Sequence, residues 1–164
     1  MSTAPGAWLG EHDRWLAETV RLAATNVAAG GGPFAAAILC DGNIVATGTN
    51  EVVTGLDPTA HAEVVAIRAA CRALGRFSLA GCLLVSSCEP CPMCLSAALW
   101  SRVDQVIYAA DRYDAARAGF DDLAFYRLFE QDRRTWPIPV AHHRVDSHDA
   151  PFRAWRQHPD RIEY

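Results

Sequence analysis

Two short motifs carry the side chains best suited to chemistry: His-Ala-Glu at residues 61–63 and Pro-Cys-Pro-Met-Cys at residues 90–94. An imidazole and two thiolates are ligands that Zn²⁺ prefers in proteins. A zinc ion with three protein ligands keeps its fourth position for water, which is typical of a catalytic rather than a structural site. The sequence therefore predicts one Zn²⁺ per chain bound by His61, Cys91 and Cys94.

Glu63 is the carboxylate that this ligand set leaves free. Zinc lowers the pKa of a bound water from about 15.7 toward about 7, which yields hydroxide at neutral pH. Glu63 is then placed to accept the water proton and pass it on, first to a ring nitrogen and then to a departing amine. A His-x-Glu followed by Pro-Cys-x-x-Cys is the pattern of zinc enzymes that remove an amino group from a nucleobase.

Two other interpretations of these motifs remain open. Cys88 precedes Cys91 by three residues and could be the fourth ligand of a closed, structural zinc site. We favour the catalytic site because Pro90 stiffens the turn between Cys88 and Cys91, and because a closed site would leave Glu63 without a role. In the second interpretation, His61 is a hydrogen-bonded surface residue and the cysteines fill a core.

Length and composition predict a single domain over residues 1–164. The net charge of -4 gives no electrostatic reason to expect a nucleic acid as partner. The chain contains no lysine, which excludes Schiff-base chemistry. We see no signal peptide and no membrane span, so we expect a cytoplasmic protein with no membrane partner. Its thiols should stay reduced, with Cys40, Cys71 and Cys82 as small core residues.

The hydrophobic pattern alternates between helices and strands, which predicts an α/β fold with helices on both faces of one sheet and some parallel pairing. Asp41-Gly42-Asn43 between two apolar runs indicates a β-hairpin. The expected helices cover residues 11–29, 57–75, 91–100, 121–130 and 150–158, and the expected strands cover 34–39, 44–49, 83–85, 103–109 and 138–145.

Both motifs fall where a helix is expected to begin. The first N–H groups of a helix are unpaired and its dipole favours negative charge, so thiolates are stabilised there. Cys91 and Cys94 are three residues apart and share one helix face. His61 and Glu63 are two apart, so they converge only if their helix starts at His61.

The segments at residues 59–64 and 87–95 resemble the cytidine deaminase superfamily. More narrowly, residues 57–63 and 118–122, and the ending formed by 152–155 and 163–164, resemble the small zinc-dependent guanine deaminases of bacteria. The resemblance implies a three-layer α/β/α sandwich with a central mixed five-stranded sheet. It also implies hydrolysis of guanine to xanthine and ammonia by zinc-activated water.

Substrate contacts are likewise implied by this resemblance. Phe34 matches a phenylalanine that packs near the base. Asn50 matches an asparagine that hydrogen-bonds the purine edge, and Asp122 matches an acidic residue that recognises the polar edge of the substrate. Trp100 matches an aromatic residue that lines the pocket, and His61 and Ala62 are also expected to contact the substrate. Tyr164 matches a terminal tyrosine that enters a partner subunit's pocket. A homodimer with residues 145–164 exchanged between subunits is therefore expected.

Other functions compete with this prediction. A deaminase of cytosine, of a nucleoside or of an ammeline-like triazine would use the same zinc chemistry. An adenosine deaminase of transfer RNA shares the motifs, but it needs a basic face for phosphates, which the net acidity disfavours. A zinc-stabilised binding module without activity is the fourth alternative.

Overall fold

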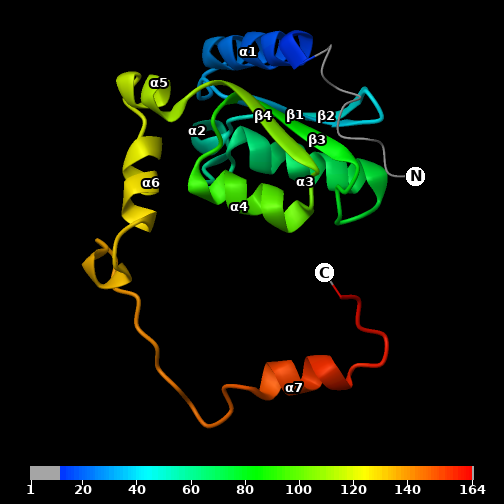
Figure 1. Cartoon of the computed structure of the whole chain (residues 1–164), viewed down its shortest axis with the longest axis vertical. Helices are drawn as coiled ribbons and strands as arrows, with labels where there is room; N and C mark the ends of the chain where they lie inside the picture. The colour runs from blue at the N-terminus through cyan, green and yellow to red at the C-terminus, as the bar shows by residue number, and fades with distance from the viewer. Residues whose placement is uncertain (1–11, 164) are drawn as a thin grey trace. The chain divides into compact units, whose positions relative to one another are not determined.

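A hairpin and two further strands form the sheet of the computed structural model, which describes residues 12–163 (Figure 1). The strands are β1 (Ala35–Cys40), β2 (Asn43–Thr49), β3 (Cys82–Cys88) and β4 (Gln105–Ala110), in the order β2-β1-β3-β4. β1 pairs antiparallel with β2 and β3, and β3 pairs parallel with β4. Asp41 and Gly42, at φ 50° and 76°, make the left-handed turn of the hairpin. The predicted hairpin is confirmed.

The helices of the described residues are α1 (His12–Ala28), α2 (Val52–Gly55), α3 (Ala62–Leu74), α4 (Pro92–Ser101), α5 (Arg112–Arg117), α6 (Asp122–Phe129) and α7 (Ala150–Gln157), with a 3₁₀ turn at Arg133–Thr135. The chain divides into two units, Met1–Tyr126 and Arg127–Tyr164. Within the first unit, α1 covers one face of the sheet and α3 and α4 lie on the other (Figure 1). This arrangement confirms the predicted three layers.

Alternate side chains of β1 pack on opposite faces of the sheet. Ala37 and Leu39 are fully buried beside Trp15 and Leu16 of α1. Ala36 and Ile38, one residue out of phase, pack with a row of small residues on α3. Because successive residues of a strand point to opposite faces, this short apolar run can support a helix layer on each side.

Gly48 on β2 lets α3 lie directly on the sheet. A Cβ atom at this position would stand 2.4 Å from the carbonyl oxygen of Ala62 and 2.5 Å from the backbone nitrogen of Ala66. Only glycine permits so close an approach without moving the helix. Since Ala62 is the first residue of α3, this packing also fixes the position of the His-Ala-Glu motif.

The expected fifth strand is not part of the sheet in the described residues. In the described residues the sheet has four strands, and the expected strand over 138–145 is an exposed segment without regular structure. Its apolar residues Ile138, Val140 and Val145 are 54–65% exposed. A strand needs the edge of a partner strand for its backbone hydrogen bonds, and within one chain this segment pairs with none.

Cys40 and Cys82 also differ from expectation. They face each other across β1 and β3, with their Cα atoms 4.4 Å apart, and they form a disulfide. The prediction that both thiols stay reduced is therefore wrong, because the pairing register brings them within bonding range. Cys71 is a free, partly buried thiol as expected.

No helix between residues 12 and 163 combines the length and the hydrophobicity that crossing a bilayer requires.

Candidate zinc and substrate site

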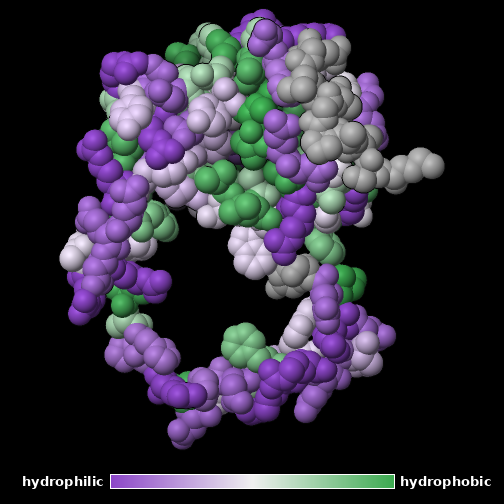
Figure 2. Space-filling model, viewed as in Figure 1, coloured by the Kyte–Doolittle hydropathy of each residue, from purple (hydrophilic) through white to green (hydrophobic). Residues whose placement is uncertain are grey.

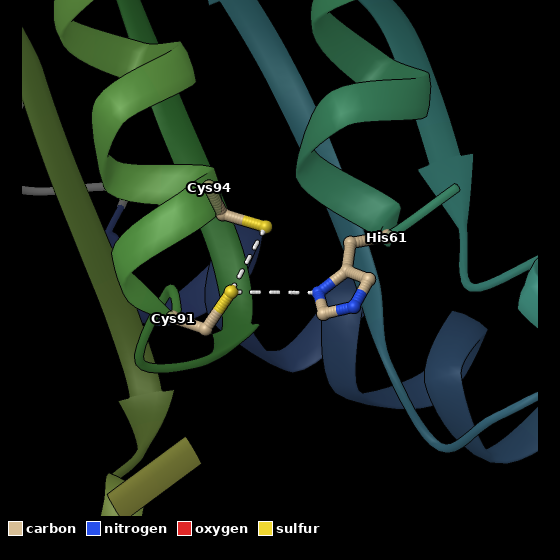
Figure 3. A group of neighbouring side chains, drawn as sticks. All are labelled: His61, Cys91 and Cys94. Atoms are coloured by element: carbon tan, nitrogen blue, oxygen red, sulfur yellow. Dashed lines mark hydrogen bonds between the residues drawn. The ribbon is translucent and has the colours of Figure 1, made fainter. Parts of the chain in front are cut away.

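The first residues of α3 and α4 bring the two motifs together. His61 is the N-cap of α3 and Cys91 is the N-cap of α4, and neither side chain caps its own helix. The helix expected over residues 57–75 begins only at Ala62, so its expected start at residue 57 is wrong, whereas the condition for His61 and Glu63 to converge is met. Cys94 lies one turn into α4 with its side chain fully buried. The three side chains are thus free to face one another, and Figure 3 shows that they do.

The distances in this group fit a tetrahedral metal. The Sγ atom of Cys91 lies 3.6 Å from Nδ1 of His61 and 3.6 Å from Sγ of Cys94. Tetrahedral Zn²⁺ with its usual bond lengths separates two sulfurs by about 3.8 Å and a sulfur from a nitrogen by about 3.6 Å. Among the described residues, these three form the group of side chains able to hold a metal ion.

The hydrogen bond between the two thiols shifts their pKa values in opposite directions. The hydrogen bond with Cys94, and then that with His61, lowers the pKa of Cys91 to about 4. The same bond and burial raise the pKa of Cys94. Cys91 is therefore the thiol that loses its proton more easily, and a bound cation would favour the thiolate form of both.

Cys88 stands outside this group. It is buried at the end of β3, and its Sγ donates to the carbonyl oxygen of Asp111 at 3.7 Å. Burial raises the pKa of this thiol to about 12. Among the described residues, the candidate ligands are therefore His61, Cys91 and Cys94 without Cys88. Three protein ligands favour a catalytic zinc site over a closed structural one.

Glu63 lies beside the ligands in the first turn of α3. Its side chain is buried, and its Oε1 accepts a hydrogen bond from Ser86 Oγ at 2.9 Å. Burial raises the pKa of this carboxyl. A carboxyl whose orientation is fixed and whose pKa is raised is well suited to accept a proton and release it again.

A cavity of about 260 Å³ opens over His61, Cys91 and Glu63. Pockets for drug-sized molecules measure roughly 300–1,000 Å³, so this one suits a single small ring system. Its walls come from five parts of the first unit: the loop before β1, the segment from the end of β2 to the start of α2, the start of α3, the loop before α4, and the start of α6 with the turn before it. The lining residues are Gly32, Phe34, Asn50, Val52, Val53, His61, Glu63, Glu89, Cys91, Phe120, Asp121, Asp122 and Phe125.

Four of the predicted substrate residues line this cavity: His61, described above, and Phe34, Asn50 and Asp122. Phe34 packs edge-to-face on Phe120, with ring centroids 4.8 Å apart. Asn50 is buried, and its Oδ1 accepts from the backbone N–H of Val52 at 3.3 Å. Asp122 is half-buried, and burial raises its pKa. The cavity thus combines aromatic faces with polar groups at its edge, as recognition of a flat base requires.

The structure places the other predicted contacts elsewhere. Trp100 lies near the C-terminal end of α4, 64% exposed, with Arg102 over its ring at 5.7 Å. Within one chain it does not line the cavity. The side chain of Ala62 is fully buried in the core below α3. Tyr164 lies outside the described residues.

Some lining residues were not predicted. Phe120 belongs to the segment 118–122 and Glu89 to the segment 87–95, both of which resemble the family, so both had a sequence signal. Val53 and Phe125 had none, because exposed apolar residues on short helices resemble ordinary surface positions.

The asparagine Asn26 holds the wall that carries Phe34 and Asn50. Its Nδ2 donates to the carbonyl oxygens of Gly32 and Asn50, both at 2.9 Å. The backbone N–H of Asn50 in turn donates to the carbonyl of Phe34 at 3.0 Å. One amide at the end of α1 therefore ties together the two segments of this wall.

Comparison with known proteins supports the zinc interpretation. The family model "Cytidine and deoxycytidylate deaminase zinc-binding region" matches residues 10–110. A guanine deaminase of Bacillus subtilis is 49% identical over 154 residues, covering 93% of this chain and 99% of the relative. The solved structure of a guanine deaminase from the same organism matches with a TM-score of 0.90 over 93% of this chain and 98% of its own.

Two further relatives bear on the substrate. The protein NE0047, solved in complex with 2,6-diaminopurine, is 38% identical with a TM-score of 0.64, covering 68% of this chain and 62% of that one. A tRNA-specific adenosine deaminase of Aquifex aeolicus is 45% identical, but over 48% of this chain and 52% of the relative. The similarity to guanine deaminase thus extends through the C-terminal region, whereas that to the tRNA enzyme covers half of each chain.

Proposed function

The chain belongs to the cytidine and deoxycytidylate deaminase zinc-binding family, and on that premise we propose that it is a guanine deaminase. It hydrolyses guanine to xanthine and ammonia. The observation that carries the proposal is the placement of a three-ligand zinc group and a buried carboxylate in one small cavity. The 49% identity over nearly the full length of a guanine deaminase is the reason to propose guanine rather than another base as the substrate.

Glu63 moves the protons in this reaction. His61, Cys91 and Cys94 would hold a zinc ion, which would supply the Lewis acidity that activates water. Glu63 accepts the water proton and returns it to the ring nitrogen next to the carbon under attack. Glu63 then carries the remaining proton of the added hydroxyl group to the amino group; the C–N bond breaks, ammonia leaves, and the added oxygen becomes the carbonyl of xanthine. The hydrogen bond from Ser86 keeps the carboxylate oriented for both transfers.

The base is held against aromatic side chains and read at its edge. Phe34 and Phe120 supply apolar faces for a flat heterocycle, while Asn50 and Asp122 supply a hydrogen-bonding amide and carboxyl. Glu63, Glu89, Asp121 and Asp122 all line this cavity. Such a surface repels phosphate, which favours a free base over a nucleotide or an RNA.

Ammonia release from zinc-loaded protein tests the substrate. The panel contains guanine, guanosine, cytosine, cytidine, adenine and ammeline. We expect guanine to have the highest kcat/KM. Dominant turnover of a pyrimidine or of ammeline would reject guanine as the substrate and leave the zinc site intact. No turnover of any base would reject the enzymatic function in favour of a zinc-binding module.

We also propose a homodimer in which residues 145–164 are exchanged. Two observations support an interface between copies. Met93, Leu95, Leu99 and Trp100 are 36–68% exposed on α4, and Figure 2 shows apolar side chains exposed over this helix. In the second unit, α7 leaves Phe152 and Trp155 65% and 43% exposed. Exposed apolar groups of this kind mark contacts with another chain.

Complementation tests the exchange. A Glu63→Gln chain and a chain lacking only Tyr164 are each expected to be inactive or strongly impaired. If the tail acts in the partner's pocket, mixing and refolding the two restores activity, because mixed dimers contain one intact zinc site with one intact tail. If the tail acts within its own chain, mixing restores nothing. Unchanged kinetics after deletion of Tyr164 would exclude the residue from the pocket.

A further inference from the structure

The segment after β4 supplies one wall of the cavity. Phe120, Asp121, Asp122 and Phe125 come from the start of α6 and the turn before it. No residue of α6 is buried, so core packing does not fix this helix. Specific contacts must therefore set its position relative to the zinc ligands.

Tyr126 makes one such contact with the metal-ligand loop. Its hydroxyl donates to the carbonyl oxygen of Pro90 at 2.6 Å. Pro90 immediately precedes the ligand Cys91. Tyr126 also follows Asp122 by four residues, about one helical turn, so the two side chains project from the same face of α6. A restraint on Tyr126 therefore restrains Asp122.

Arg112, at the start of α5, contacts both Glu89 and Tyr126. Its Nε and its backbone N–H donate to Oε2 of Glu89 at 2.9 and 3.0 Å, and its Nη2 donates to Oε1. The guanidinium carbon lies 3.4 Å from the centroid of the Tyr126 ring. The edge of the planar guanidinium group thus hydrogen-bonds Glu89 while its face stacks on the ring of Tyr126. A lysine ammonium group is not planar and cannot make both contacts.

We propose that Tyr126 and Arg112 are positioning residues, which hold the α6 wall and Asp122 at a fixed distance from the zinc-ligand loop. Neither side chain touches the substrate; both act through Asp122. The functional part of this inference rests on the proposed deaminase activity. Its structural part concerns the attachment of α6 alone and can be measured without turnover.

Tyr126→Phe is the first test, because it removes the hydroxyl and keeps the ring for Arg112. We expect kcat/KM for the best base to fall about tenfold, which corresponds to about 1.4 kcal/mol. Zinc content should stay at one per chain. Amide hydrogen exchange should become faster over residues 122–129 and stay unchanged in α3. Tyr113→Phe, at an exposed tyrosine on α5, is the matched control and should change neither quantity.

A double-mutant cycle separates positioning from a general loss of structure. If Tyr126 acts through Asp122, then Tyr126→Phe combined with Asp122→Asn has the same kcat/KM as Asp122→Asn alone. Additive losses would overturn the inference, as would unchanged exchange in α6 or unchanged kcat/KM in Tyr126→Phe. A wild-type protein that deaminates no base would reject the proposed function, while the exchange experiment would still decide whether Tyr126 holds α6.

Discussion

The two sides of the cavity are built in different ways. The zinc side comes from the first turns of α3 and α4, whose inner residues Ala66, Ala70 and Ala98 are buried in the core. The base side comes from the loop before β1, the end of β2 and the start of α6. Its members are held by side-chain hydrogen bonds, such as those of Asn26 and Tyr126.

This difference separates two kinds of requirement. The metal ligands and Glu63 need a fixed geometry for the reaction to occur, and core packing gives it to them. The base side decides which ring enters and how it lies, and its separate segments can shift a little without unfolding the protein. Changes on the zinc side should therefore abolish activity, whereas changes on the base side should weaken it by degrees.

The largest effect is expected from loss of a ligand. Cys94→Ala removes a buried thiol from the zinc group and should lower zinc affinity by more than the roughly 10- to 100-fold cost of altering an outer partner. Turnover should disappear with the metal. Zinc per chain, measured after dialysis against a chelator, checks this. Cys88→Ala is the matched control and should keep one zinc per chain; equal loss in both variants would indicate a closed four-ligand site.

Glu63→Gln should have the next largest effect. The amide keeps the shape of the carboxyl but cannot accept the water proton, so kcat should fall by about 10²- to 10⁴-fold. Zinc content and the melting temperature should stay close to the wild-type values, because the ligands are untouched. Steady-state ammonia release together with metal analysis measures both. Turnover at the wild-type rate would show that another group moves the protons.

Asp122→Asn tests the base side directly. Loss of one hydrogen-bonding charge to the substrate costs about 1–3 kcal/mol, so kcat/KM for guanine should fall roughly 5- to 150-fold while zinc binding is kept. Asp13→Asn, which neutralises an exposed carboxylate on α1, should leave kcat/KM unchanged. A loss as large as that of Glu63→Gln would mean that Asp122 takes part in proton transfer and that the division between the two sides is wrong.

The same division explains what the sequence could predict. His61, Glu63, Cys91 and Cys94 lie within two short motifs, and helix starts position them, so local spacing was sufficient. The helix bounds at 91–100 and the hairpin were likewise set by local signals, proline and an Asp-Gly turn.

The base side could not be predicted from local signals. Asn50 and Asp122 lie 72 positions apart in the sequence, and their shared cavity depends on the sheet register and on contacts such as that of Tyr126 with Pro90. Residues 138–145 carry a strand-like pattern, but a pattern supplies no partner strand, and the segment stays exposed within one chain. Trp100 is apolar in sequence and exposed in the structure, which no periodicity distinguishes.

Asn26→Ala should give a smaller effect on the base side. It removes the donor to the carbonyls of Gly32 and Asn50, so the wall that carries Phe34 can shift. A loss of about 1.4 kcal/mol in base binding raises KM about tenfold, with kcat little changed. Asn43→Ala, whose side chain bonds only locally in the hairpin turn, is the control and should leave KM unchanged. A fall in kcat without a rise in KM would contradict a role in holding the base.

The last prediction concerns stability rather than activity, at the Glu89–Arg112 pair where the two sides of the cavity meet. Arg112 lowers the pKa of Glu89 below its usual value, mainly through the side-chain hydrogen bonds. A lowered carboxyl pKa in the folded state stabilises the protein above the unfolded pKa of about 4.3, and this contribution is lost as the pH falls through the folded pKa.

Arg112→Gln should therefore reduce the free energy of unfolding by about 1–2 kcal/mol between pH 6 and 8, because the pair is less than one-third exposed. The difference from wild type should shrink below about pH 4. Urea unfolding at several pH values measures it, and a constant difference down to pH 3 would show that Arg112 stabilises the fold by packing on Tyr126 rather than by charge.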